Sequence, residues 1–264
     1  MAKPRMCFAL LYAAGSFHLS RNFKLQAVGN FDWLMENYEF ESISRSIDEL
    51  VILNVSRGET DWPDFITTLQ KLVRQCFMPV AVGGGIRSAY QARQLFENGA
   101  DKVVLNSAFF KNPELVGTLV KSYGAQSIVA SIDFRRDEAG DTRVFIDGGV
   151  TDAEVDLSTA VSCAADLGAG EIYLTSIDRD GTGMGYDIPA LELAHSGCDL
   201  PIIAAGGADT SDRLAEGILS GYASAVSTAH LFNFMCDGLQ DARRKLITDG
   251  IPLSHWNFEG IAAC

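Results

Sequence analysis

The sequence predicts an α/β protein with the fold of a (β/α)8 TIM barrel, assembled from two half-barrels. An apolar run that ends in glycines, PVAVGGGI at residues 79–86, recurs as PIIAAGGA at residues 201–208, an offset of 122 residues without a gap. Strand-like apolar runs also alternate with helical patterns along the chain, as a parallel sheet with helical connections requires. A duplicated half of this length is typical of a barrel made of two halves.

The repeat extends beyond the glycines. At the same offset Gly99 falls on Gly221, Val104 on Val226, Phe110 on Phe232 and Glu49 on Glu171. The alternative is a chance similarity between two glycine-rich βα units. We expect one domain over residues 1–264, with half-barrels at about 1–122 and 123–250, because 264 residues with 47% hydrophobic side chains can bury one large core.

The first half alternates predicted strands and helices. Apolar runs place the strands at residues 6–13, 49–55, 79–83 and 102–105. The helices are expected at residues 31–45, 61–76 and 88–98, and residues 14–30 are expected to form a long loop. Apolar side chains recur at helical spacing in the second helix, at Phe65, Leu69, Leu72 and Val73. Ser88 is placed to cap the third helix.

The second half follows the same order. Strands are expected at residues 127–132, at 171–176, in the run that enters Gly206, and at 225–227. Residues 143–146 are expected to form a small hairpin strand, and helices are expected at residues 152–167 and 237–249.

Composition excludes several functions. A net charge of −13 opposes binding to nucleic acids or anionic membranes through bulk charge. The cysteines are dispersed, with no CxxC pair, which predicts reduced thiols without disulfide, structural zinc or other metal. Residues 6–14 imitate the core of a signal peptide, but they are few, and a strand buried on both faces reads the same way. We therefore expect a cytoplasmic protein without a cofactor.

The two glycine runs predict a ligand with two phosphates. Glycines at the end of a strand let main-chain N–H groups approach an anion, and the next helix adds partial positive charge. The residues in question are Gly84 and Gly85 in the first half, and Gly206 and Gly207 in the second. Because the chain is acidic, local main-chain donors have to hold the phosphates.

Polar residues that could carry chemistry follow the predicted strands, where barrels hold their active sites. Asn106 and Ser107 follow one strand, and Asp133 ends another after an apolar run. Burial there would raise the pKa of Asp133 and suit it to acid or base work. The alternative is an exposed carboxylate paired with Arg135 or Arg136. For Asp178 and Asp180, capping of the glycine-rich turn is the alternative to a functional role.

Several motifs carry a family resemblance. GGGIR (83–87), ADKVVLNSA (100–108), SIDFRR (131–136), GAGEIYLTSIDRDGTGMGYD (168–187) and AAGGA (204–208) resemble the HisF-type cyclase subunit of imidazole glycerol phosphate synthase, over residues 5–252. This resemblance implies a lyase of histidine biosynthesis. A glutaminase at the barrel bottom would supply ammonia through the core, for reaction with a bis-phosphorylated aminoimidazole carboxamide ribonucleotide at the top.

The resemblance also implies roles for particular residues. Gly85, Asn106 and Ser107 would bind one phosphate, and Gly206, Gly207 and either Ala229 or His230 the other. Asp133 would be one of two catalytic aspartates, with Thr175 and Asp180 lining the substrate groove. Arg5, Glu49, Lys102 and Glu171 match the charged gate of the ammonia entrance, for which structural salt bridges are the alternative. Asp101 matches a position that meets the glutaminase.

One departure separates this chain from the histidine enzyme. The family's other catalytic aspartate corresponds to Leu11, its loop lysine to Leu19, and its second-strand aspartate to Asn54. Leucine cannot transfer a proton, and losing such a group removes about 10²–10⁴-fold in rate. Leu10 and Leu11 resemble a HisF-like paralogue branch of surface-polysaccharide clusters, which is paired with a HisH-like glutaminase and serves a sugar amidotransferase that forms acetamidino groups. The alternatives are an authentic cyclase, a silent ammonia-conducting scaffold and another phosphate-binding barrel.

Overall fold

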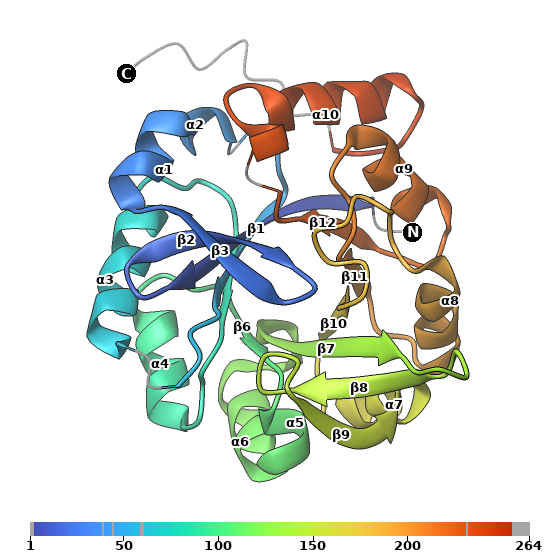
Figure 1. Ribbon diagram of the computed structural model, residues 1–264. Coiled ribbons are helices and arrows are strands. Elements are labelled where there is room, and N and C mark those ends of the chain that lie inside the picture. The colour runs from blue at the N-terminus through green and yellow to red at the C-terminus, as the bar shows by residue number, and fades with distance from the viewer. Residues whose placement is uncertain (1–2, 39, 44, 59–60, 231, 255–264) are drawn as a thin grey trace.

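The computed structural model describes residues 3–38, 40–43, 45–58, 61–230 and 232–254. Its centre is a closed barrel of parallel strands, as predicted (Figure 1). The barrel closes because β12 pairs with β1 and β10 pairs with β7. In order around the barrel, the strands are β1 (Arg5–Ala13), β4 (Glu49–Asn54), β5 (Val80–Gly83), β6 (Lys102–Leu105), β7 (Ile128–Arg136), β10 (Glu171–Ser176), β11 (Ile202–Ala205) and β12 (Ala225–Thr228).

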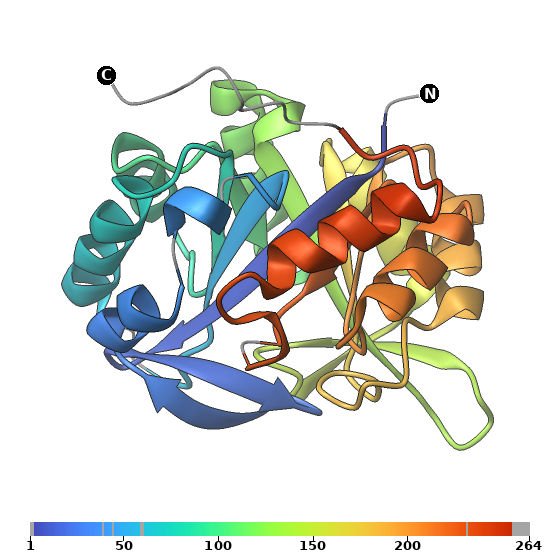
Figure 2. The ribbon, with the colours of Figure 1, turned by 90° about the horizontal axis from the view of Figure 1, so that it is seen from above.

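Helices surround the barrel (Figures 1 and 2). They include α3 (Trp62–Val73), α4 (Ala89–Glu97), α5 (Ala108–Lys111), α6 (Pro113–Tyr123), α7 (Leu157–Asp166), α8 (Ile188–Gly197), α9 (Ser211–Leu219) and α10 (Gly238–Thr248). Side-chain caps begin several of them: Ser88 accepts a hydrogen bond from the Gln91 N–H, as predicted, and Asp61 caps α3 in the same way. Within the described residues, no helix is long and apolar enough to cross a bilayer.

Alternation along the strands produces two separate cores. On β1, Met6, Phe8 and Leu10 point outward and pack against the helices, whereas Cys7 and Ala9 point into the barrel. The inner core consists of small and β-branched residues, apart from one tyrosine: Cys7, Ala9, Val51, Ala81, Val104, Val129, Tyr173, Ile203, Ala205 and Ala225. The barrel interior is therefore a packed core.

The prediction of a loop at residues 14–30 is wrong. These residues form an antiparallel hairpin on β1, made of β2 (Ser16–Arg21) and β3 (Lys24–Gly29). Asn22 and Phe23 both have positive φ, at 50° and 61°, which gives the two-residue turn that fits the strand twist. The sequence does not indicate this turn, because Phe23 occupies a position where glycine is usual.

Two predicted helices have different bounds. The helix expected at residues 31–45 is divided into α1 (Phe31–Asn37) and α2 (Phe40–Ile43), because Tyr38 takes an extended conformation. The helix expected at 152–167 begins only at Leu157, where Asp156 caps it. The residues before it form β9 (Thr151–Asp156), which pairs with β8 (Thr142–Ile146), so the predicted hairpin strand at 143–146 is confirmed.

The two hairpins lie at the same end of the barrel. Figure 2 shows β2–β3 and β8–β9 projecting at the end opposite the start of β1. This is the end at which the parallel strands have their carboxyl termini. The hairpins therefore form part of the rim around the upper opening.

Candidate functional site

One cavity of about 690 Å³ opens at the carboxyl ends of the barrel strands. Apart from Asp178, it brings together the residues that the sequence analysis considered for a functional role at the top of the barrel. These are Leu11, Gly84, Gly85, Asn106, Ser107, Asp133, Thr175, Asp180, Gly206, Gly207, Ala229 and His230. Residues from both halves of the chain thus line a single space.

The glycines of both runs are required by close packing. Gly84 has a φ of 95°, and a Cβ there would lie 1.9 Å from the carbonyl oxygen of Asn54. At Gly206, with a φ of 85°, a Cβ would lie 2.6 Å from the carbonyl oxygen of Ser176. Asn54 and Ser176 are themselves 122 residues apart, so the same contact occurs in both halves. Only glycine fits these two positions.

Asp133 is buried and lines the cavity. Its carboxylate accepts hydrogen bonds from Asn106 Nδ2 at 3.3 Å and from Ser131 Oγ at 3.4 Å. Burial raises the pKa of Asp133 to about 7, although hydrogen bonds from Thr175 and Ser131 lower it. A carboxyl with this pKa can give or take a proton near neutral pH.

The alternative reading of Asp133, an exposed pairing with a neighbouring arginine, does not hold. Arg136 forms a bidentate pair with Asp187, with N···O distances of 2.9 and 2.8 Å. The guanidinium of Arg135 lies over the ring of Phe145. Neither arginine neutralises Asp133.

Leu11 faces Asp133 across the barrel. β1 and β7 are four strands apart in the closed ring, which makes them diametrically opposed. Leu11 is 8% exposed and lines the same cavity. One wall of the cavity thus carries a carboxyl group, and the opposite wall carries an alkyl side chain that can neither donate nor accept a proton.

Asp180 fastens the β2–β3 hairpin over the cavity. Its carboxylate accepts hydrogen bonds from Ser20 Oγ and, at 3.0 Å, from the main-chain N–H of Phe23. Asn22 adds bonds from its amide to the carbonyl oxygens of Ile177 and Asp178, at 3.1 and 2.8 Å. The Asp180 carboxylate therefore binds a turn, but this is the β2–β3 turn of a segment far away in the sequence and not its own glycine-rich turn. Burial raises the pKa of Asp180.

Asp178, the other carboxylate in this turn, has a different contact. It accepts a hydrogen bond at 2.9 Å from the main-chain N–H of Arg136 on β7 and does not line the cavity.

Ser107, predicted to bind phosphate, contacts a carboxylate. Its Oγ lies 3.1 Å from Asp147 Oδ1 and accepts a hydrogen bond at 3.2 Å from the Asp147 N–H. Lys111 donates to Asp147 at 2.6 Å. The hydrogen bond from Lys111 holds the pKa of Asp147 below its usual range, so this carboxylate is charged at neutral pH.

Sequence reasoning missed several residues of the cavity. Arg57, Arg87 and Lys111 supply positive charge, and Leu25, Leu53 and Phe23 extend the apolar wall beside Leu11. A weak signal existed for Arg87 and Lys111, since both follow shortly after strands whose ends were recognised. Arg57 and Phe23 belong to loops whose positions only the folded chain defines.

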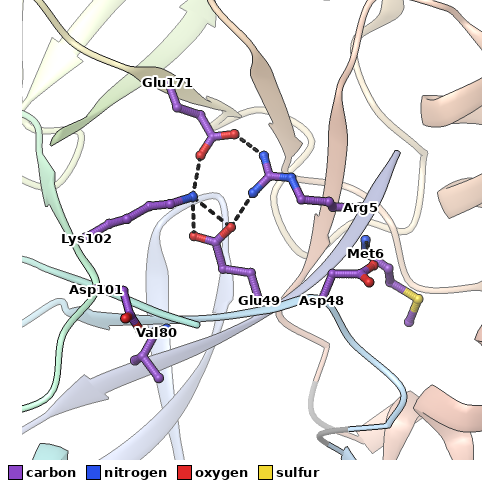
Figure 3. A network of polar contacts seen from close by, with 8 residues as sticks. All are labelled: Arg5, Met6, Asp48, Glu49, Val80, Asp101, Lys102 and Glu171. Atoms are coloured by element: carbon purple, nitrogen blue, oxygen red, sulfur yellow. Dashed lines mark hydrogen bonds and ion pairs between the residues drawn. The ribbon is translucent and has the colours of Figure 1, made fainter. Parts of the chain in front are cut away.

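The opposite end of the barrel holds a closed ring of charges (Figure 3). Arg5 pairs with both Glu49 and Glu171. Lys102 Nζ also lies 2.9 Å from each of these glutamates. Burial alone would lower the pKa of Lys102, but the two glutamates raise it above its usual value. The four residues, which we call the charge ring, begin strands β1, β4, β6 and β10, as predicted.

Asp101, next to the charge ring, is exposed and accepts a hydrogen bond at 2.8 Å from the Val80 N–H. Figure 3 shows it beside Lys102, with Asp48 bound similarly to the Met6 N–H. Asp101 thus fixes the start of β5. Its contact with a glutaminase stays a prediction. Within the described ranges, no group of three His, Cys, Asp or Glu residues has the arrangement of a metal site.

Comparison with known proteins agrees with this architecture. Residues 32–235 match a family model described as "Histidine biosynthesis protein". The chain is 46% identical over 257 residues to a protein of Parasynechococcus marenigrum (strain WH8102) named "Putative imidazole glycerol phosphate synthase subunit hisF2". That alignment covers 97% of this chain and 95% of the relative.

Proposed function

The chain belongs to the histidine biosynthesis protein family, among its HisF-like cyclases, and from this premise we propose that it is the synthase subunit of a glutamine amidotransferase complex. The cavity at the top would bind a bis-phosphorylated ligand between the two glycine runs. A HisH-like glutaminase would dock at the bottom and release ammonia beneath the charge ring.

The observation that carries this proposal is the pairing of the charge ring with the cavity on one barrel axis. A barrel that only binds a phosphorylated ligand at its top has no need of two buried glutamates at its bottom. Buried charges cost free energy unless they are paired well, and here Arg5 and Lys102 each bridge both glutamates. A ring that shifts to admit a neutral molecule would explain why these charges lie there.

Leu11 favours the paralogue that serves acetamidino-sugar or surface-polysaccharide biosynthesis. The cyclisation is expected to use two opposed aspartates, and the wall opposite Asp133 offers only leucine. The ammonia-delivering parts of the molecule are kept, which suits a subunit that passes nitrogen to a sugar amidotransferase.

A turnover assay tests this preference. The purified chain is given ammonium salt and the bis-phosphorylated ribonucleotide of the histidine pathway. We expect turnover at least about a hundredfold slower than that of a HisF cyclase assayed in parallel, because one proton-transferring group is missing. Turnover within about tenfold of that cyclase would contradict the paralogue and favour the histidine enzyme.

The authentic cyclase is the second candidate, and two observations favour it. The relative from Parasynechococcus marenigrum carries the name of an imidazole glycerol phosphate synthase subunit. Asp133 also keeps a pKa of about 7, which suits it to act alone as acid and base. If the chain is instead a silent ammonia-conducting scaffold, Asp133→Asn will leave nitrogen transfer unchanged.

The partner is tested at the charge ring. We expect a one-to-one complex with a glutaminase on the bottom face, and Glu171→Gln to change the share of glutamine nitrogen that reaches the product. Glu97→Gln serves as the control, because Glu97 forms an exposed pair with Arg93 on α4. If no glutaminase co-purifies and the two variants behave alike, the four charges are structural.

A further inference from the structure

Tyr173 lies in the barrel interior between the charge ring and the cavity. Glu171, Tyr173 and Thr175 alternate along β10, so their side chains share the inner face of that strand. Tyr173 is 5% exposed and lies in register with Ser131 on β7 and Ile203 on β11. Its phenol is therefore one step above the ring and one step below the level of Thr175 and Asp133.

The phenol spans the inner face of a neighbouring strand. Its hydroxyl lies 3.0 Å from Ser227 Oγ on β12, and β11 runs between β10 and β12. Ala205, on β11, is small enough to leave room. The main-chain carbonyl of Ser227 accepts a hydrogen bond at 2.9 Å from the hydroxyl of Tyr186, so Ser227 is fixed in place and holds the phenol across the interior.

Tyr173 also marks the floor of the cavity. The inner-core residues that also line the cavity are Ala9, Val104, Tyr173 and Ala205, and Ser227 lines it beside them. The remaining inner-core residues are buried and do not line the cavity: Cys7, Val51, Ala81, Val129, Ile203 and Ala225. Tyr173 is the largest side chain of the inner core, and below it only these smaller residues separate the cavity from the charge ring.

The hydroxyls of Tyr173 and Ser227 are not fully used by one another. Two hydroxyls carry two protons, and a single hydrogen bond joins them. In the part of the chain that the structure describes, neither hydroxyl has another protein partner, which leaves one hydroxyl proton without a protein acceptor beside the cavity. Such a group normally costs free energy. Burial also raises the pKa of Tyr173 well above its usual value, and the charges of Cys7 and Asp133 raise it further, so the phenol keeps its proton.

We propose that Tyr173 is the narrow point of the barrel interior, and that its hydroxyl and that of Ser227 form a relay site for a small, neutral, hydrogen-bonding molecule. The lone pair of ammonia can accept a hydrogen bond from the spare hydroxyl proton. Ammonia is also small enough for a space that is too narrow for a phosphorylated substrate. The identity of this molecule rests on the proposed function, whereas the constriction does not. The interior then has two closures in series, the charge ring and the phenol.

Cys7 offers a way to test the constriction without partner or substrate. It belongs to the inner core, is completely buried and, unlike Tyr173, does not line the cavity. The full chain is treated with methyl methanethiosulfonate, and modification of the Cys7 peptide is followed by mass spectrometry. Tyr173→Leu, which shortens the side chain, should raise the rate at least about tenfold. Tyr173→Phe keeps the ring but frees it from Ser227, and should raise the rate about two- to tenfold, the range for one hydrogen bond.

Phe65→Leu is the matched control. Phe65 is a fully buried aromatic residue of α3 in the outer core, so its loss destabilises the protein without removing a contact of Tyr173 or Ser227. Equal Cys7 rates in Tyr173→Leu and Phe65→Leu would overturn the constriction. An unchanged rate in Tyr173→Phe would overturn the role of the hydroxyl pair. Because this assay uses the chain alone, its failure is distinct from failure of the proposed function, which shows in nitrogen transfer.

Discussion

At the scale of single residues, Asp133 links the chemistry of the site to the stability of the protein. Its folded pKa of about 7 exceeds the usual value of 3.8, chiefly because of burial. The folded state therefore holds a proton that the unfolded state releases between pH 4 and 7, so stability falls as pH rises through this window. Above pH 7 the charged form is buried at full cost.

We predict that Asp133→Asn stabilises the protein at pH 8 and has little effect at pH 4. Asparagine is neutral at both pH values and can still accept hydrogen bonds from Ser131 and Asn106. The gain at pH 8 should reach up to about 4 kcal/mol, from about 1.4 kcal/mol for each unit of pKa shift. Urea unfolding of both proteins at the two pH values measures it. A gain of equal size at pH 4 would show that charge burial is not the cause.

Asp147 places a negative charge next to a residue that is predicted to bind phosphate. Its carboxylate is bound to Ser107 and Lys111, and Ser107 is one of the residues predicted to bind a phosphate. A phosphate arriving there has to displace this carboxylate or tolerate its charge. Asp147 and the phosphate thus compete for the same donors.

We predict that Asp147→Asn strengthens binding of inorganic pyrophosphate about three- to tenfold, because one like charge leaves the site while Ser107 and Lys111 remain. Titration calorimetry at fixed ionic strength measures the change. Asp152→Asn is the control, since Asp152 pairs with Arg143 on the same β8–β9 hairpin and lies outside the cavity lining. Identical affinities in both variants would contradict the competition.

At the scale of elements, the β2–β3 hairpin is a cover held by few contacts. Its turn is fastened by Asp180 and Asn22, and the Arg57 side chain donates at 2.7 Å to the carbonyl oxygen of Phe23. No residue of β3 is fully buried. An element with few buried contacts opens locally at low free energy.

We predict that Asp180→Ala lowers hydrogen-exchange protection of the β2–β3 amides about tenfold, because two hydrogen bonds to the turn are lost at about 0.5–1.5 kcal/mol each. Exchange followed by mass spectrometry resolves the hairpin peptide. Asp178→Ala is the control, because the Asp178 side chain binds Arg136 on β7 and does not contact the hairpin. Equal loss of protection in both variants would show that the whole turn is disturbed and that Asp180 has no particular role.

At the scale of the whole molecule, the charge ring connects four strands from both halves of the chain. It contains two cations and two anions, and its glutamates are the most buried members, with side chains 2% and 7% exposed. Removing one cation leaves buried negative charge that Arg5 alone has to balance. Substitution of a single residue of the charge ring should therefore lower the stability of the whole barrel.

We predict that Lys102→Met destabilises the protein by about 2–4 kcal/mol, near the range for breaking a buried ion pair. Lys245→Met should destabilise the protein much less, since Lys245 forms pairs with Asp212 and Asp249 on the surface, where solvent screens them. Denaturant unfolding of the two variants makes the comparison. If both lose the same small amount, solvent already screens the ring and its charges are not effectively buried.

Local pattern in the sequence was sufficient for the strands of the barrel and the two glycine runs, but not for β2, β3 and β9. The residues of the charge ring were indicated by the family resemblance. A barrel strand depends on its neighbours in the chain, because it is an apolar run of strand length with glycines or polar residues at its end. Once the strands are placed in a barrel, the first residues of β1, β4, β6 and β10 converge at one end, and the last residues converge at the other. The ring and the cavity therefore follow from sequence together with a known topology.

The contacts between segments far apart in the chain became known only from the tertiary structure. Asp147 reaches Ser107 across 40 residues, Asp180 reaches Ser20 across 160, and Tyr173 reaches Ser227 across 54. Nothing in the local pattern of either partner indicates such a pairing. Each contact exists because barrel closure and the hairpin folds bring particular side chains within hydrogen-bond distance, and that geometry depends on all the strands at once.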